Sequence, residues 1–165
     1  MKLESLRDLY IAELQDLYDA EQRITKALPK MAEGANSPDL RSAFQEHLRQ
    51  TQGHVERLER VFQKLDEPAK GRKCKGIVGI IDEGEDMMGE DGPAAVCDAA
   101  LIAAAQRVEH YEIAAYGTVR TYARRLGYQD QAQLLDETLQ EEGETDKKLT
   151  SLAESYINEE AKSAR

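Results

Sequence analysis

The chain has 165 residues, a length that suits one domain with a sizeable buried core, and its 41% hydrophobic and 33% charged residues are ordinary for a globular protein. Its 32 acidic residues outnumber its 22 basic ones, and the resulting net charge of −10 disfavours nucleic acid as a partner and favours a cation. No apolar run approaches the roughly 18 residues that a membrane-spanning helix needs. The start of the chain, MKLESLRDLY, lacks the apolar core of a signal peptide. We therefore expect a cytoplasmic protein without a membrane partner.

The first half of the chain predicts two long helices. Apolar residues recur at helical spacing over residues 3–32, where Pro29 is expected to kink or loosen the last turn. A polar break follows. Ser37 and Pro38 then suit the N-cap and the first residue of a second helix over residues 38–65.

The second half predicts a long connection and two further long helices. The connection over residues 66–92 contains one short helical segment at 77–88. The third long helix spans residues 93–126 and the fourth spans residues 130–160. Because no segment alternates polar and apolar residues with a period of two, we expect an all-α protein.

The lengths of the connections constrain the topology. The short stretches GANS and LGYQ favour antiparallel helical hairpins, whereas the long middle connection can travel the length of a bundle. Two antiparallel hairpins joined by one long crossover are the arrangement of ferritin-like bundles. We predict a single domain, residues 1–165, with this four-helix architecture.

A weak internal repeat places acidic residues on the apolar faces of the helices. A shift of 91 positions aligns the apolar stripes of the two hairpins and places Glu21 on Glu112. The same shift places Thr51 on Glu142, which lies on the stripe of the fourth helix. Three helices therefore bring a carboxylate to the face that should be buried.

Carboxylates that meet in an apolar core repel one another, and their pKa values rise unless a cation compensates the charge. The second helix offers His54 near this level, and Glu109 lies one turn before Glu112 on the third. Carboxylates and imidazole together suit iron or manganese. Alternatively, these glutamates are solvated, or neighbours such as Gln22 satisfy them by hydrogen bonding. The residues alone leave both interpretations open.

The chain also resembles a known family over nearly all of its length. The telling segments are ELQDLYDAEQ, ITKALPKMA, AFQEHLRQTQGHVERLE, DAALIAAAQRVEHYEIAAYGT and LLDETLQEEGETDKKLT. They are similar to the YciF-type ferritin-like stress proteins, small cytoplasmic helical bundles of bacteria related to rubrerythrins and bacterioferritins. The resemblance implies a ferritin-like four-helix bundle, a homodimer, an association with stress responses, and a dinuclear metal site with ferroxidase-type chemistry.

The ferritin-like pattern can be carried over position by position on the first three long helices. It asks for one Glu on the first helix, which Glu21 fits. It asks for Glu-x-x-His on the second, where His54 is present but Thr51 occupies the Glu position. The third helix should supply a Glu, and Glu109 and Glu112 both qualify.

The fourth helix departs further from the pattern, which expects a second Glu-x-x-His there. The choices are Glu142 followed by Thr145, or Glu141 followed by Glu144, so the second histidine is missing. The ligand set that the resemblance implies is therefore Glu21, His54, Glu109, Glu112 and Glu142, with Glu141 as an alternate.

Other residues near these positions allow two interpretations. His47 lies two turns before His54 on nearly the same face and could bind metal or carry a proton, but such a histidine is more often satisfied and half-buried. His110 points away from Glu109 and is more often a structural or dimer contact. Gly53 and Gly143, inside helices, indicate either close backbone approach or a local bulge.

We therefore expect a dimeric ferritin-like protein that binds iron or manganese within the bundle and oxidises Fe(II) with O2 or peroxide. The alternative is a bundle that is metal-free or holds a single structural metal and acts as a stress-induced interaction protein. Thr51 and Thr145, at positions where ligands are expected, favour this alternative.

Overall fold

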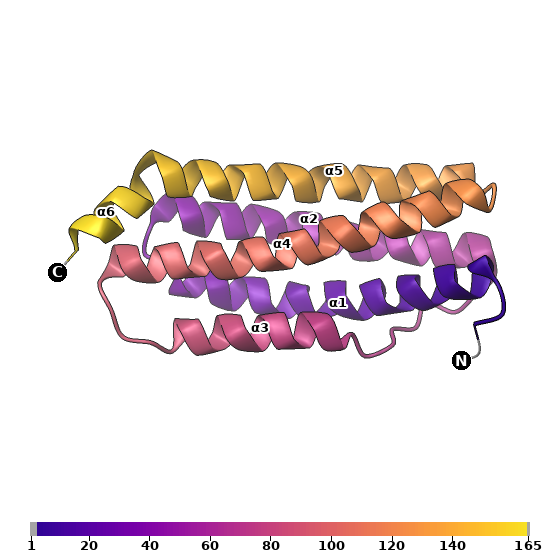
Figure 1. Ribbon diagram of the computed structural model, residues 1–165, viewed down its shortest axis with the longest axis horizontal. Coiled ribbons are helices and arrows are strands. Elements are labelled where there is room, and N and C mark those ends of the chain that lie inside the picture. Colours follow the sequence, from indigo (N-terminus) through magenta and orange to yellow (C-terminus); the bar gives the residue numbers. More distant parts are fainter. Residues whose placement is uncertain (1–2, 165) are drawn as a thin grey trace.

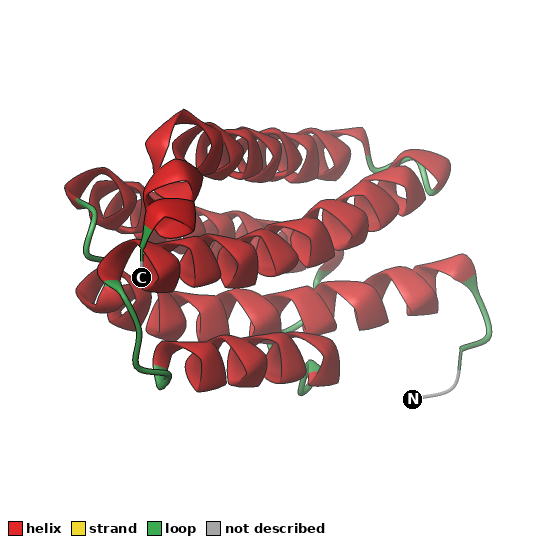
Figure 2. Ribbon diagram, turned by 60° about the vertical axis from the view of Figure 1, so that its left-hand side comes forward, coloured by secondary structure: helices red, strands yellow, loops and turns green. Residues whose placement is uncertain are grey.

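The computed structural model describes residues 3–164, and over this range the regular structure is entirely helical (Figure 2). None of the helices in this range is long and apolar enough to cross a membrane. In chain order the elements are α1 (Leu6–Gly34), α2 (Pro38–Leu65), α3 (Lys75–Met88), α4 (Ala94–Arg125), α5 (Gln129–Leu152), a π-helical turn (Ala153–Ile157) and α6 (Asn158–Ser163).

The four long helices lie lengthwise against one another as two antiparallel hairpins, α1 with α2 and α4 with α5 (Figure 1). The connection after α2 returns along the outside of the bundle and carries α3, which packs on α1 and α4. Helices α2 and α4 consequently run in the same direction (Figure 1). The predicted ferritin-like topology, with a short helix in the crossover, is confirmed.

Local capping decides where the helices begin. The Ser37 hydroxyl accepts a hydrogen bond from the Leu40 amide at 3.3 Å, so α2 begins at Pro38 as predicted. Helix α1 begins at Leu6, not at residue 3, because the Ser5 hydroxyl accepts from the Asp8 amide at 3.1 Å and fixes the first turn.

The C-terminal ends of the first and the fourth predicted long helices also differ from expectation. Helix α1 continues past Pro29 to Gly34. The segment predicted as one helix over residues 130–160 is interrupted by the π-helical turn at Ala153–Ile157, after which α6 completes it. Both differences lie at one end of the bundle, away from the residues that are discussed below.

The apolar core consists of two clusters along the bundle axis. One surrounds Ile24, Phe44 and Leu101, and the other surrounds Leu17 and Leu58. On α1, Glu21 lies between Leu17 of one cluster and Ile24 of the other. A layer of buried charged residues therefore separates the two apolar clusters at mid-length.

Candidate metal centre

Six side chains of the kinds that bind metals are almost completely buried in this middle layer. They come from all four long helices, and at most 2% of the surface of any of them is exposed: Glu21, His47, His54, Glu109, Glu112 and Glu142. Burying a charge is costly unless the charge is paired and hydrogen-bonded. The layer therefore requires a specific source of compensation.

The six side chains form two groups that share one carboxylate. His47, Glu109, Glu112 and Glu142 each offer an atom within 4.8 Å of those of the others, and Glu21, His54 and Glu142 do the same. Because Glu142 belongs to both groups, the arrangement offers two adjacent cation positions joined by one carboxylate.

His54 is held firmly from its outer side. Its Nε2 lies 2.8 Å from Oε2 of Glu141. The Arg57 guanidinium donates hydrogen bonds to both oxygens of Glu141, at 2.6 and 2.8 Å. The inner nitrogen, Nδ1, lies 2.9 Å from Oε1 of Glu142 and 3.4 Å from Oε1 of Glu21. The outer contacts thus orient the ring so that Nδ1 points into the layer.

These contacts shift the pKa values of both partners. Burial disfavours the charged form of His54, but Glu21, Glu141 and Glu142 outweigh burial and raise its pKa to about 12. The hydrogen bond from His54 lowers the pKa of Glu141, and the hydrogen bonds and charge of Arg57 lower it further. They outweigh partial burial, which raises the pKa, and bring it to about 2. Glu141 is thus a firm anionic partner for the outer nitrogen.

His47 is held in a similar way by neutral groups. The Thr145 hydroxyl lies 3.3 Å from Nδ1 of His47 and donates to the side-chain oxygen of Gln50 at 3.4 Å. Since the hydroxyl proton points to Gln50, the Thr145 oxygen can accept a hydrogen bond from the Nδ1–H group of His47. The other nitrogen, Nε2, lies 3.2 Å from Oε1 of Glu109. Burial opposes the charged ring, but Glu109 outweighs burial and raises the pKa of His47 to about 9.

The carboxylates of the layer are crowded and poorly satisfied. Among the described residues, nine buried side-chain nitrogen or oxygen atoms have no hydrogen-bond partner, and eight of the nine belong to the six residues of the layer. Both oxygens of Glu112 are among them. Burial, followed by the charges of Glu142, Glu21 and Glu109, raises the pKa of Glu112 well above its ordinary value. Burial likewise raises the pKa of Glu142 to about 7, although His54 partly opposes the shift.

Tyr116 satisfies one oxygen of Glu21. This fully buried tyrosine donates its hydroxyl to Oε1 of Glu21 and leaves Oε2 without a partner. Burial and the Glu21 carboxylate raise the pKa of Tyr116 well above its ordinary value, so the phenol remains a donor. Tyr116 therefore positions Glu21 with one oxygen left for a further partner.

Four carboxylates and two imidazoles from four helices are the donor set of di-iron and di-manganese carboxylate bundles. Their side chains converge with eight nitrogen and oxygen atoms lacking a hydrogen-bond partner, an arrangement that an apolar core disfavours and that a cation would compensate. By this donor set and these unsatisfied atoms, the residues fit a pair of such ions.

The sequence matches a family model and a bacterial relative over nearly its full length. A family model described as a domain of unknown function, DUF892, matches residues 5–162. The chain is 44% identical to Protein YciF of Escherichia coli strain K12 over 162 residues, which make up 98% of each chain. The chain belongs to the YciF family. The predicted family resemblance is thus confirmed.

Three solved structures share the fold. The crystal structure of the E. coli stress protein YciF matches with a TM-score of 0.90 and 44% identity, covering 94% of this chain and 98% of that one. YcfI of Rhodopseudomonas palustris, described as having a proposed structural role, matches with a TM-score of 0.89 and 44% identity over 91% and 96% of the two chains. A Xanthomonas campestris protein at 22% identity and a TM-score of 0.72, covering 93% and 94%, shares the fold alone.

In this YciF-family chain the structure brings together five of the residues predicted from sequence: Glu21, His54, Glu109, Glu112 and Glu142. The alternate, Glu141, lies outside both groups. Its side chain is 29% exposed, and its two oxygens are occupied by His54 and Arg57. The residue thus supports His54 from outside the layer.

Two further positions differ from the expectation. His47 is not half-buried and satisfied, because it is 2% exposed and its Nε2 has no hydrogen-bond partner. Both histidines consequently come from α2, two turns apart, where the ferritin-like pattern has one on each of two helices. Thr51, at the expected Glu position, is buried and donates its hydroxyl to the His47 carbonyl at 2.9 Å within the helix.

The remaining candidates lie apart from the layer. His110 has a side chain that is 69% exposed and contacts Asp146 at 3.3 Å. The interpretation of Gly53 and Gly143 as points of close approach is wrong, since a methyl group built at either residue meets no atom within 4 Å outside the backbone of its own helix.

Proposed function

We propose that this YciF-family chain is a ferritin-like metalloprotein that binds two iron or manganese ions in its middle layer. The observation that carries the proposal is the convergence of six buried donor residues with eight unsatisfied atoms, in two groups joined by Glu142. Burial and then the charges of the neighbouring carboxylates raise the pKa of Glu112, and positive charge in this layer would remove that repulsion.

The roles of the residues follow from the two groups. Glu21 and His54 would hold one ion and His47, Glu109 and Glu112 the other, with Glu142 shared. A bound pair of iron ions would supply one-electron redox chemistry for oxidising Fe(II), with O2 or peroxide as the electron acceptor.

Residues around the layer orient the metal-binding side chains. The contact of Glu141 with His54 and that of Thr145 with His47 fix the outer nitrogens and leave the inner ones for the ions. Tyr116 holds one oxygen of Glu21. The two apolar clusters on either side exclude water and strengthen every charge interaction between them.

A second candidate function is a stress-related structural protein without redox chemistry. Two observations favour it: the structural role proposed for the relative from R. palustris, and the use of the Thr51 hydroxyl within its own helix. In this case the layer would hold no ion or a single structural one. The homodimer that the family resemblance implies is compatible with either function and is tested by sedimentation.

Metal analysis separates the two functions. Protein purified without chelator and then loaded anaerobically with Fe(II) or Mn(II) should bind two ions per chain. Addition of O2 or peroxide to the Fe(II)-loaded protein should then produce Fe(III) faster than in protein-free solution. Protein that binds no ion after loading, with or without an oxidant, would support the structural role instead.

A further inference from the structure

A cavity of mixed polar and apolar lining leads from the surface to the layer between α2 and α5. Its volume is about 120 Å³, and Glu109 of α4 closes its inner end. The residues that matter for the argument are Glu46, His47, Gln50, Glu109, Thr145 and Lys148.

The inner end of the cavity has two polar atoms without hydrogen-bond partners. His47 and Glu109 are at most 2% exposed, and His47 Nε2 and Glu109 Oε2 have no hydrogen-bond partner. These two residues belong to the group that would hold the second ion. A cation that crosses the cavity would therefore arrive at the Glu109 carboxylate and at His47, whose Nε2 gives up its proton when it binds the ion.

The walls offer oxygens at intermediate depth. Gln50 and Thr145 are partly buried, and their side-chain oxygens lie 3.4 Å apart across the cavity. Thr145 stands where the ferritin-like pattern has a histidine, and its smaller side chain leaves room between α2 and α5. Neutral oxygens of this kind replace the water of a hydrated cation in steps.

An ion pair spans the mouth. Lys148 of α5 contacts Glu46 of α2, and both side chains are about half exposed, at 48% and 49%. The ammonium group of Lys148 therefore occupies Glu46, one of the two exposed carboxylates, with Glu144, that line the cavity.

We propose that this cavity is the route by which a divalent cation reaches the layer, with Lys148 as its gate. The cation displaces the Lys148 ammonium from Glu46, passes the oxygens of Gln50 and Thr145, and reaches Glu109 and His47. The inference rests on the proposed metal binding and adds to it the path and the controlling residue.

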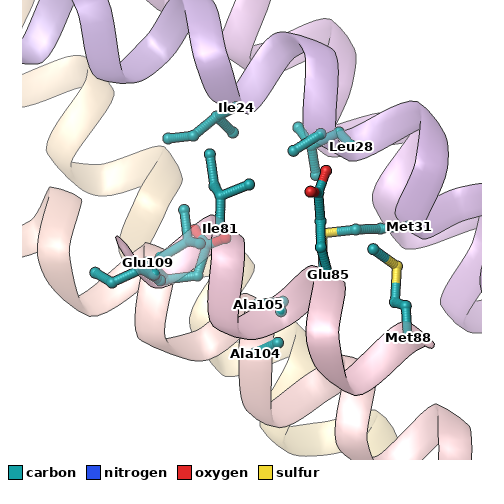
Figure 3. Close-up of a pocket in the computed structure, with 13 residues that line it drawn as sticks. Ile24, Leu28, Met31, Ile81, Glu85, Met88, Ala104, Ala105 and Glu109 are labelled. Atoms are coloured by element: carbon teal, nitrogen blue, oxygen red, sulfur yellow. The ribbon is translucent and has the colours of Figure 1, made fainter. Parts of the chain in front are cut away.

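A second cavity, of about 30 Å³, also touches Glu109 but has a different character. It lies between α1, α3 and α4, and Figure 3 shows apolar side chains around it, including Met31 and Met88. Such a lining has little to replace the water around a cation. At its edge Glu85 pairs with Lys30 at 2.7 Å, which makes Lys30 a matched control for Lys148.

The test is the rate of Co(II) uptake by metal-free protein at low salt, followed by stopped-flow absorbance. Lys148→Met should accelerate uptake roughly three- to tenfold, because it frees Glu46 and removes a positive charge from the mouth. Glu46→Gln should slow uptake by a similar factor. The number of ions bound at equilibrium should remain two in both variants, and added salt should shrink both effects.

Lys30→Met makes the same change of charge at the apolar cavity and should leave the rate unchanged. Unchanged rates in both Lys148→Met and Glu46→Gln would overturn the route, as would an equal acceleration in Lys30→Met. Failure of the unsubstituted protein to take up any Co(II), Mn(II) or Fe(II) would instead overturn the metal-binding function, and the route with it.

Discussion

Nδ1 of His54 lies 2.9 Å from Oε1 of Glu142, and both side chains are fully buried at the middle of the bundle. Neither atom has a partner with hydrogen-bond geometry, although the outer nitrogen of His54 is firmly held by Glu141. The pair therefore combines a fixed imidazole with a carboxylate that belongs to both candidate cation positions. Metal-free protein must compensate these groups with protons, and metal ions would replace those protons.

Glu112→Gln tests whether the buried carboxylate of Glu112 serves to bind metal. Because neither oxygen of Glu112 has a hydrogen-bond partner, the variant should bind fewer than two ions per chain. Its metal-free form should be more stable by about 1–3 kcal/mol at pH 8, since a carboxylate no longer has to be buried charged or kept protonated above its ordinary pKa. Metal analysis and urea unfolding check the two effects, with Glu56→Gln on the exposed face of α2 as the control. Unchanged metal content with lower stability would show that Glu112 is an ordinary core residue and not a metal ligand.

The stability of the metal-free protein should depend on pH in a defined direction. Folding raises the pKa of Glu142 from 4.5 to about 7 and that of His47 from 6.5 to about 9, so the folded state binds more protons than the unfolded state. The stabilisation is fully present below the unfolded pKa values and is lost as pH rises through the folded ones. We expect the free energy of unfolding to fall by several kcal/mol between pH 5 and about pH 9.

Chemical unfolding at several pH values, with and without Mn(II), measures this effect. Metal should reverse the trend, because ions bind more tightly once the protons leave. A metal-free protein whose stability is constant or increases over this range would contradict the account.

Two variants of Glu141 test whether it supports His54 or binds metal itself. Glu141→Gln keeps an oxygen that can accept from Nε2 of His54, so its metal affinity should remain close to that of the unsubstituted protein. Glu141→Leu removes the acceptor and should weaken the affinity about 10- to 100-fold, with two ions still bound at saturation. Titration with Mn(II) measures both. If Glu141 were a ligand, both variants would lose an ion at saturation.

Gly53→Ala and Gly143→Ala should each stabilise the protein by about 0.5–1 kcal/mol. A methyl group has open space at both positions, and alanine favours the helix. Thermal unfolding of the metal-free variants checks the gain, and metal content should remain that of the unsubstituted protein. Loss of stability would show that the backbone conformation at these positions requires glycine.

Much of the fold and most of the layer could be predicted, because periodicity reports which residues face inward. Glu21 and Glu112 lie on apolar stripes at equivalent positions of the repeat, and both are fully buried. The sequence prediction begins α1 three residues too early, although Ser5 followed by Asp8 is a recognisable capping pattern. No signal marks the π-helical turn at Ala153–Ile157, which depends on packing at the end of the bundle.

The second imidazole, His47, is considered from the sequence but left out of the predicted ligand set for a different reason. The family pattern asks for a histidine on the fourth long helix, where Thr145 stands, whereas the structure supplies His47 from α2 on the other side of that threonine. Periodicity gives the face of His47 but not the depth of its burial or its distance from Glu109 on another helix. The contact of Glu141 with Arg57 is likewise a matter of how α2 and α5 pack.

Anomalous diffraction from crystals soaked in Mn(II) tests the central claim most directly. The account predicts two peaks within the bundle, one among Glu21, His54 and Glu142 and the other among His47, Glu109, Glu112 and Glu142. Crystals of intact protein that show no anomalous peak among these six residues at saturating Mn(II) would contradict it.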